Sequence, residues 1–185
     1  KSFKQLMPAY GVDNGVHPDH HAWWIHPTNG KYMMDGNDGG LNITKDGGKT
    51  WRFVGNIPVG QFYHIATDME FPYNVYGGMQ DNGSWRGPAY VWKAQGIRNS
   101  YWQEISFGDG FDVVPDSSNN RYGYAMSQGG SLGRYDRTTG NTSTIRPVHP
   151  EGLDLRFHWN AAIAHDPFDK TTIYYGSQFV HKSID

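Results

Sequence analysis

The most informative stretch of this sequence is TKDGGKTW, residues 44–51, in which a turn of Asp and Gly is closed by a large aromatic residue. A weaker copy, RYDRTTG, occupies residues 134–140, and residues 183–185 open another. Asp side chains bond to nearby backbone amides in turns, and Gly supplies the positive φ that turns require. We therefore interpret the motif residues as structural, neither catalytic nor calcium-binding. They are Thr44, Asp46, Gly48, Trp51, Asp136, Gly140, Ser183 and Asp185.

A second repeat accompanies this motif along the whole chain. Each copy has an apolar strand, a polar turn, and a Tyr-rich strand that ends in Gly and a polar pair. The copies are Ala22–Gly40, His64–Gly83, Phe111–Gly130 and Ala161–Phe179. They recur about every 45 residues, a spacing typical of a four-stranded propeller blade. Helical periodicity is almost absent. We predict one all-β domain, residues 1–185: a partial β-propeller of four-stranded antiparallel blades, with approximate repeats 1–51, 52–92, 93–140 and 141–185.

Composition excludes several classes of protein. The 185 residues include no Cys, which excludes a disulfide scaffold and a thiolate zinc site. The net charge of −2 offers no basic field for nucleic acid. No apolar run approaches the roughly 18 residues of a membrane span. An aromatic content of 15% is too high for a disordered chain. We expect no cofactor, no nucleic-acid partner and no membrane span.

The sequence resembles the BNR/Asp-box β-propeller superfamily. The resemblance rests on the Asp-box at 44–51, the turns Asn37–Gly40 and Gln80–Gly83, and the lead-in His17–His21. It is strongest to secreted bacterial proteins of the type "glycosyl hydrolase, BNR repeat", which are similar to sortilin-type and xyloglucanase-type propellers. The resemblance implies about four blades of a larger ring, completed by further blades of the same propeller or by a second copy. It also implies a secreted, cell-surface or periplasmic location.

Blade topology predicts where ligands bind. In an up-and-down blade, the start of the first strand and the turn between the second and third strands share one rim, and Asp-boxes lie on the other. Loop-borne polar and aromatic groups on a rigid scaffold are typical of binding sites. The candidate ligand-binding residues are His20, Gln61, Gln80, Trp85, Trp92, Gln128, Trp159 and Gln178. Trp85 and Trp92 are the candidate sugar-stacking platforms, because they lie in the one repeat that has lost its Asp-box.

Three carboxylates on the predicted rim are candidate catalysts: Asp38, Asp81 and Asp109. Glycoside hydrolysis needs two carboxylates about 5–10 Å apart, and adjacent blades can supply them. The competing interpretation is that these are ordinary turn residues. On an extended strand, His17, Asp19 and His21 would project to one side and could hold a metal. We favour strand-end capping for them and predict no metal.

Two functions remain open from the sequence. The first is a propeller that binds, and in its enzymatic version hydrolyses, a glycan or polysaccharide on the rim opposite the Asp-boxes. If the chain is an enzyme, it is a glycoside hydrolase. The alternative is a non-catalytic propeller of sortilin type that binds a peptide or protein or serves as a scaffold. Two carboxylates facing a common groove with aromatic walls would favour hydrolysis.

Overall fold

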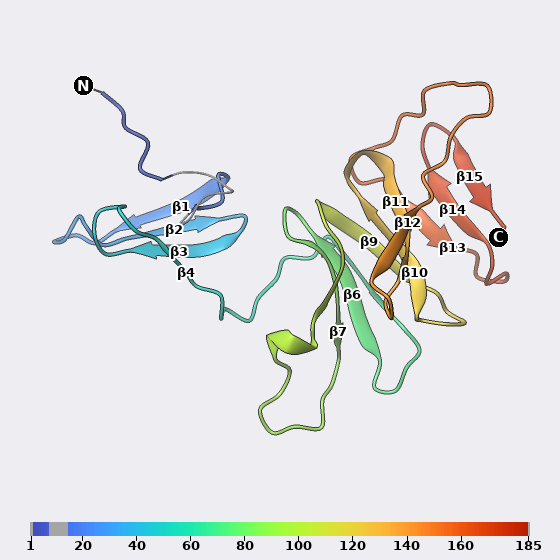
Figure 1. Cartoon of the computed structure of the whole chain (residues 1–185), viewed down its shortest axis with the longest axis horizontal. Coiled ribbons are helices and arrows are strands. Elements are labelled where there is room, and N and C mark those ends of the chain that lie inside the picture. Colours follow the sequence, from blue (N-terminus) through green and yellow to red (C-terminus); the bar gives the residue numbers. More distant parts are fainter. Residues whose placement is uncertain (1, 8–14, 185) are drawn as a thin grey trace. The chain divides into compact units, whose positions relative to one another are not determined.

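The computed structural model describes residues 2–7 and 15–184, and these are almost entirely strands and turns. The chain divides into two compact units, Lys1–Val59 and Gly60–Asp185, which are described separately (Figure 1). In the described residues, no helix is long and apolar enough to span a membrane. The only helical elements there are two short 3-10 turns, η1 (Asn99–Tyr101) and η2 (Gln128–Gly130).

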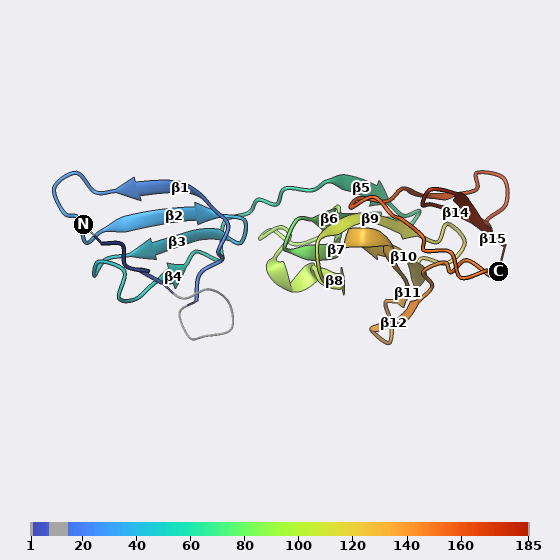
Figure 2. The ribbon, with the colours of Figure 1, turned by 90° about the horizontal axis from the view of Figure 1, so that it is seen from above.

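The first unit holds one antiparallel sheet in the order β1-β2-β3-β4, whose strands lie side by side in Figure 2. The strands are β1 (His20–Ile25), β2 (Met33–Asn37), β3 (Gly40–Thr44) and β4 (Arg52–Phe53). Its core is a small cluster of Met7, Val16, Met33 and Trp51. The alternating burial of β3 shows a strand with one face toward this core.

The second unit holds three antiparallel sheets, each in an up-and-down order. The second sheet of the chain consists of β5 (His64–Thr67), β6 (Asn74–Met79), β7 (Gly83–Pro88) and β8 (Gln103–Ser106). The third consists of β9 (Gly110–Pro115), β10 (Tyr122–Ser127), β11 (Ser131–Asp136) and β12 (Asn141–Thr144). The fourth consists of β13 (Ile163–His165), β14 (Ile173–Gly176) and β15 (Val180–Ser183).

Buried side chains fill the spaces between successive sheets of the second unit. Tyr76 and Ile105 of the second sheet meet Val113, Ala125 and Tyr135 of the third. A larger cluster joins the third and fourth sheets: Phe111, Tyr124, Met126, Leu132, Ala161, Ile173 and Tyr175. Each sheet thus buries its apolar surface against the next, as propeller blades do.

The inner strands of the second and third sheets approach closely because glycines line them. A Cβ built at Gly78 would lie 2.2 Å from the backbone of Gly110 and Phe111. No side chain fits such a gap. Four-stranded up-and-down sheets that stack through their faces are the blades of a β-propeller, which confirms the predicted fold class.

The sequence repeats and the sheets are offset by one strand. The repeat at 52–92 contains β4 of the first sheet together with β5, β6 and β7 of the second. The repeats at 93–140 and 141–185 likewise begin with β8 and β12, the outer strands of the preceding sheets. Each of these repeats therefore completes the sheet before it and starts its own.

The Asp-box is a closed set of local hydrogen bonds. Thr44 Oγ1 donates to Asp46 Oδ1 at 2.9 Å, and the Lys49 and Thr50 amides donate to the same oxygen at 3.0 Å. Thr50 Oγ1 donates to the other carboxylate oxygen at 2.6 Å. These bonds, chiefly those from Thr50, lower the pKa of Asp46 to about 2. Trp51 is 8% exposed.

The degenerate copy works in a similar way. The Arg121 guanidinium donates to both oxygens of Asp136, at 2.8 and 2.6 Å, and the Thr138 amide donates to one of them. The structural interpretation of both motifs accounts for every one of these contacts. Ser183 ends β15, and Asp185 lies outside the described residues.

Candidate functional site

The two ends of each sheet carry different kinds of residues. We call the end where the first strand begins and the second strand turns into the third the strand-start rim, and the opposite end the Asp-box rim. Asp38 lies in the β2–β3 turn, Asp81 in the β6–β7 turn, and Asp109 directly before β9. All three predicted carboxylates are therefore on the strand-start rims of their units. Trp92 lies in the β7–β8 connection, on the Asp-box rim.

Asp109 connects three successive sheets of the second unit. One carboxylate oxygen accepts a hydrogen bond from the Asp81 amide at 2.9 Å, and the other accepts one from Trp159 Nε1 at 3.0 Å. The Asp109 amide donates to Gln128 Oε1 at 2.8 Å. Both oxygens are thus already engaged by N–H donors of the chain. This arrangement suits a carboxylate that fixes its neighbours better than one that transfers protons.

The predicted glutamines hold the rim together through their amide groups. Gln178 Oε1 accepts from the Arg156 amide at 2.7 Å, and its Nε2 donates to the Asp154 carbonyl at 3.0 Å. Gln80 Oε1 accepts from the Tyr63 hydroxyl at 2.6 Å. Gln61 is exposed in the segment that leads to β5. Most of the glutamines expected to bind ligands in this unit instead hydrogen-bond the turns to the segments that precede the first strands.

Trp85 is also tied to the rim. Its Nε1 donates to the Asn82 carbonyl at 2.6 Å, and the side chain is half-buried within β7. Its ring is therefore held by the β6–β7 turn. Trp85 and Trp92 do not form one platform, because they lie at opposite ends of the second sheet.

The first unit contains a buried carboxylate paired with a histidine. Asp35 is fully buried and accepts from His20 Nδ1 at 2.9 Å and from Asn37 Nδ2 at 2.8 Å. Because His20 Nδ1 is bonded to Asp35, Nε2 is the ring nitrogen left to contact a ligand. Its neighbour His21 pairs with Asp38. The candidate catalyst Asp38 is thus engaged by a histidine side chain.

Of the three weak metal candidates, His17 and Asp19 lie together, with His17 Nδ1 3.6 Å from Asp19 Oδ2, whereas His21 pairs with Asp38. His17 Nδ1 accepts from the Asp19 amide at 3.2 Å, while His21 is turned toward Asp38. The strand begins only at His20, and its register shifts between His20 and Ala22. A bulge re-aims the side chain at the extra residue, so the alternation that put His17, Asp19 and His21 on one side does not apply.

A hollow beside His20 is a concave site of the first unit. Its volume is about 370 Å³, and its lining is mostly apolar. It is lined by Gln5, Leu6, Met7, Val16, Pro18, His20 and Trp23. Trp23 is 45% exposed, and its ring lies edge-on to Trp51, with centroids 5.8 Å apart at 84°. Sequence reasoning selected His20 and missed Trp23, although the pair of Trp residues in β1 was visible.

The Asp-box rim has a different electrostatic character. Every described carboxyl with a shifted pKa is shifted downward and lies at this rim, because the Arg121 guanidinium at Asp136 and amides and hydroxyls at the others donate to it. These carboxyls are Asp46, Asp68, Glu70, Asp116, Asp136, Asp166 and Asp169. They are strong hydrogen-bond acceptors that remain ionised, and none is a poised acid.

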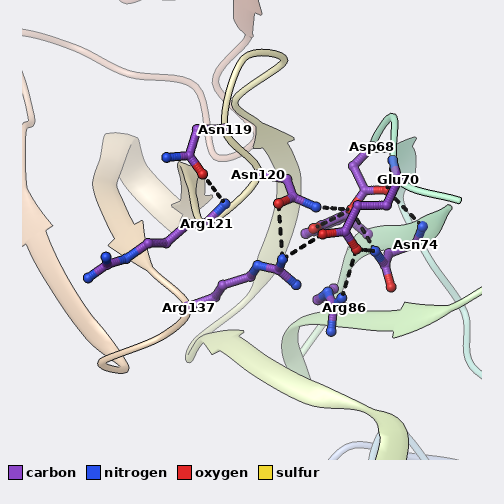
Figure 3. Close-up of polar contacts among 9 residues, drawn as sticks. Asp68, Glu70, Asn74, Arg86, Asn119, Asn120, Arg121 and Arg137 are labelled. Atoms are coloured by element: carbon purple, nitrogen blue, oxygen red, sulfur yellow. Dashed lines mark hydrogen bonds and ion pairs between the residues drawn. The ribbon is translucent and has the colours of Figure 1, made fainter.

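The largest of these clusters joins the second and third sheets (Figure 3). Buried Asp68 accepts from Asn74 Nδ2 at 2.7 Å, from Tyr76 Oη at 2.9 Å and from Asn120 Nδ2 of the third sheet at 2.8 Å. Arg137 donates to Glu70 at 2.9 Å and to Asn120 at 3.0 Å. The cluster is a polar bridge between blades.

Comparisons with known proteins return only solved structures of low similarity. No protein-family model matches the chain, and no curated protein matches it. Similar solved structures include an ancestral GH74 enzyme, with 18% identity over 85% of this chain and 22% of that one, at a TM-score of 0.41. An auxiliary nutrient binding protein from Bacteroides thetaiotaomicron shows 13% identity over 89% of this chain and 38% of that one, at a TM-score of 0.43. The structure of YCF48 bound to D1 peptide shows 14% identity over 95% of this chain and 53% of that one, at a TM-score of 0.42.

The chain spans between 22% and 53% of the length of these structures. The sheets themselves establish the fold: they are up-and-down and antiparallel, and in the second unit they stack face to face. The first sheet carries a complete Asp-box turn between β3 and β4, and the third carries a degenerate copy. The chain therefore folds as β-propeller blades that carry Asp-box turns.

Proposed function

We propose that this chain is part of a glycan-binding β-propeller and that the hollow between His20 and Trp23 receives a sugar unit. The observation that supports this proposal is the coincidence of three features in one concave site. These are a half-exposed Trp face, a His bonded to a buried carboxylate, and an apolar floor.

The chemistry of the hollow matches the two sides of a sugar ring. The C–H face of a pyranose packs on an aromatic ring, while its hydroxyls need hydrogen-bond partners. Trp23 offers the ring, and the Trp51 contact fixes its orientation. His20 Nε2 hydrogen-bonds to a sugar hydroxyl, because the other ring nitrogen, Nδ1, is bonded to Asp35. Gln5 adds an amide at the edge of the hollow.

Binding is favoured over hydrolysis by the state of the candidate carboxylates. Both oxygens of Asp109 are engaged by N–H donors, and Asp38 is paired with His21. A glycosidase needs one carboxyl free to donate a proton and another free to attack or to activate water. A location outside the cytoplasm, where polysaccharides occur, accompanies this proposal.

The test compares two tryptophans on one strand. Trp23 and Trp24 are 45% and 44% exposed, but Trp24 packs against His26 and Tyr32 and does not line the hollow. The full chain is screened on a glycan array, and hits are measured by calorimetry. We expect Trp23→Ala and His20→Ala to weaken binding at least tenfold and Trp24→Ala to leave it unchanged.

Two results would contradict the proposal. Equal effects of Trp23→Ala and Trp24→Ala would show that the hollow is not the site. Binding of extended peptides with no glycan hit would favour the sortilin-type alternative. Reducing-sugar release from a bound glycan that is abolished by Asp109→Asn, with affinity unchanged, would replace binding by hydrolysis.

A further inference from the structure

The β7–β8 connection, residues 89–102, stands where the second sheet would carry an Asp-box. It reads AYVWKAQGIRNSYW and contains four aromatic residues, two cations and no carboxylate. The whole chain has a net charge of −2, so this is a locally basic and aromatic segment. Its only regular structure is the single 3-10 turn η1, and connections of this length are usually either functional or linker segments.

Two rings of the segment are open to solvent. Trp92 is 77% exposed and Tyr90 is 52% exposed. Their centroids lie 4.8 Å apart at 79°, an edge-to-face pair that fixes the orientation of each ring. Lys93 Nζ lies 5.9 Å from the centre of the Tyr101 ring. Lys93 follows Trp92 directly in the sequence and holds its ammonium group over the Tyr101 ring.

The segment is anchored at both ends. The Ala89 amide donates to the Tyr73 carbonyl at 3.0 Å. Trp102 packs on Gly87 so closely that a Cβ there would lie 2.5 Å from its ring. The Gly96 amide closes a turn onto the Lys93 carbonyl at 2.9 Å. These contacts hold the exposed rings on a fixed base, which lowers the entropy lost on binding.

We propose that the Tyr90–Trp92 pair, with Lys93 and Arg98, is a second binding site, specific for polysaccharides that carry anionic groups. The open face of Trp92 packs on the C–H face of a sugar ring. Lys93 and Arg98 are exposed, and neither forms an ion pair with any described carboxylate, so both are available for a sugar carboxylate or sulfate.

Single-stranded nucleic acid uses similar groups but fits less well. It binds through a continuous positive groove that follows several phosphates, together with stacked bases. This segment has two cations in a chain that is acidic overall. An isolated sugar-ring contact with one or two anionic groups matches the site in size and charge.

This site is independent of the proposed hollow. It lies in the other unit, in the β7–β8 connection, whereas the hollow lies beside β1 of the first unit. Trp23→Ala therefore leaves anionic binding unchanged, and Trp92→Ala leaves the hollow unchanged. Each variant reports on one proposal only.

The experiment measures binding of the full chain to polygalacturonate, dextran sulfate and neutral dextran by affinity electrophoresis and calorimetry at about 0.15 M salt. We expect binding to at least one anionic polymer and none to dextran. The comparison of polygalacturonate with dextran sulfate identifies carboxylate or sulfate as the anionic group. Trp92→Ala should weaken binding at least tenfold, and Lys93→Gln with Arg98→Gln should reduce both affinity and its salt dependence.

The matched control lies on the same rim in the fourth sheet. Phe168 is 96% exposed in the β13–β14 turn, where Lys170 is near two carboxylates, Asp166 and Asp169. Phe168→Ala and Lys170→Gln should leave binding unchanged. The inference is overturned if neither anionic polymer binds, if Trp92→Ala and Phe168→Ala weaken binding equally, or if single-stranded DNA binds as tightly as the polysaccharides.

Discussion

Replacing Asp68 with Asn tests the polar bridge between the second and third sheets. Burial by itself would raise the pKa of this carboxyl. Hydrogen bonds from Asn74, Asn120 and Tyr76 outweigh that effect and lower the pKa from 3.8 to about 2. Asp68 is only 6% exposed, so solvent screens these bonds weakly.

The size of the effect follows from the pKa shift. A drop from 3.8 to about 2 corresponds to about 2.5 kcal/mol of interaction with the ionised form, at about 1.4 kcal/mol per pKa unit. In Asp68→Asn, the new NH2 group would face the side-chain NH2 groups of Asn74 and Asn120, and two donors facing each other lower the free energy of unfolding further. We expect Asp68→Asn to lower the free energy of unfolding by about 2–4 kcal/mol at pH 7.

The pH dependence has a definite sign. Because the folded pKa is depressed, the stabilisation is fully present above the unfolded pKa and is lost as pH falls through the folded value. The difference between wild type and Asp68→Asn should be constant above about pH 5 and shrink between about pH 4 and pH 2. Urea titrations followed by far-ultraviolet circular dichroism measure it.

The control is Asp116→Asn, at the corresponding turn of the third sheet. Asp116 accepts hydrogen bonds from Ser118 and Asn119, which belong to its own turn. Its replacement should cost less, because no contact between sheets is lost. A difference below about 0.5 kcal/mol for Asp68→Asn, or one that does not change with pH, would refute the reasoning.

Three further substitutions test the packing. Trp51→Ala should lower the free energy of unfolding by about 3–5 kcal/mol, as truncation of a buried aromatic does, and an unchanged melting midpoint of the first unit would contradict the Asp-box assignment. Gly78→Ala should cost about 2–3 kcal/mol by forcing backbones apart, whereas Gly36→Ala, whose Cβ would lie 3.4 Å from the nearest atom, should change stability by less than about 1 kcal/mol in chemical denaturation. Asp109→Ala should lower the melting temperature more than Asp109→Asn, which keeps one acceptor oxygen, and equal melting temperatures would show that its bonds to Asp81 and Trp159 contribute nothing.

The blades and their rims could be predicted from the sequence because both follow from local chemistry. Turn residues such as Asp46 and Gly48 act within a few positions of themselves, and the spacing of the copies is that of one blade. The order of strands then fixes which turns share a rim. Asp38, Asp81 and Asp109 lie where this logic put them.

The hydrogen-bond partners and orientations of the site side chains could not be predicted, because they depend on residues far away in the sequence and on bulges. Asn120 is 52 positions from Asp68, and Arg137 is 67 positions from Glu70. No local sequence pattern predicts such pairs. The register of β1 shifts after His20, and in the folded chain His20 contacts Asp35 while His21 pairs with Asp38.

The one-strand offset between repeats and sheets has consequences for folding during synthesis and for where the chain can be truncated. During synthesis, the second and third sheets cannot close until the first strand of the following repeat has left the ribosome, so each blade waits for its successor. A truncation at residue 92 or 140 would strip β8 or β12 from a finished blade and bare a strand edge prone to mispairing. Cuts placed after Ser106 or Thr144 would instead leave whole sheets, and limited proteolysis should find its stable products there.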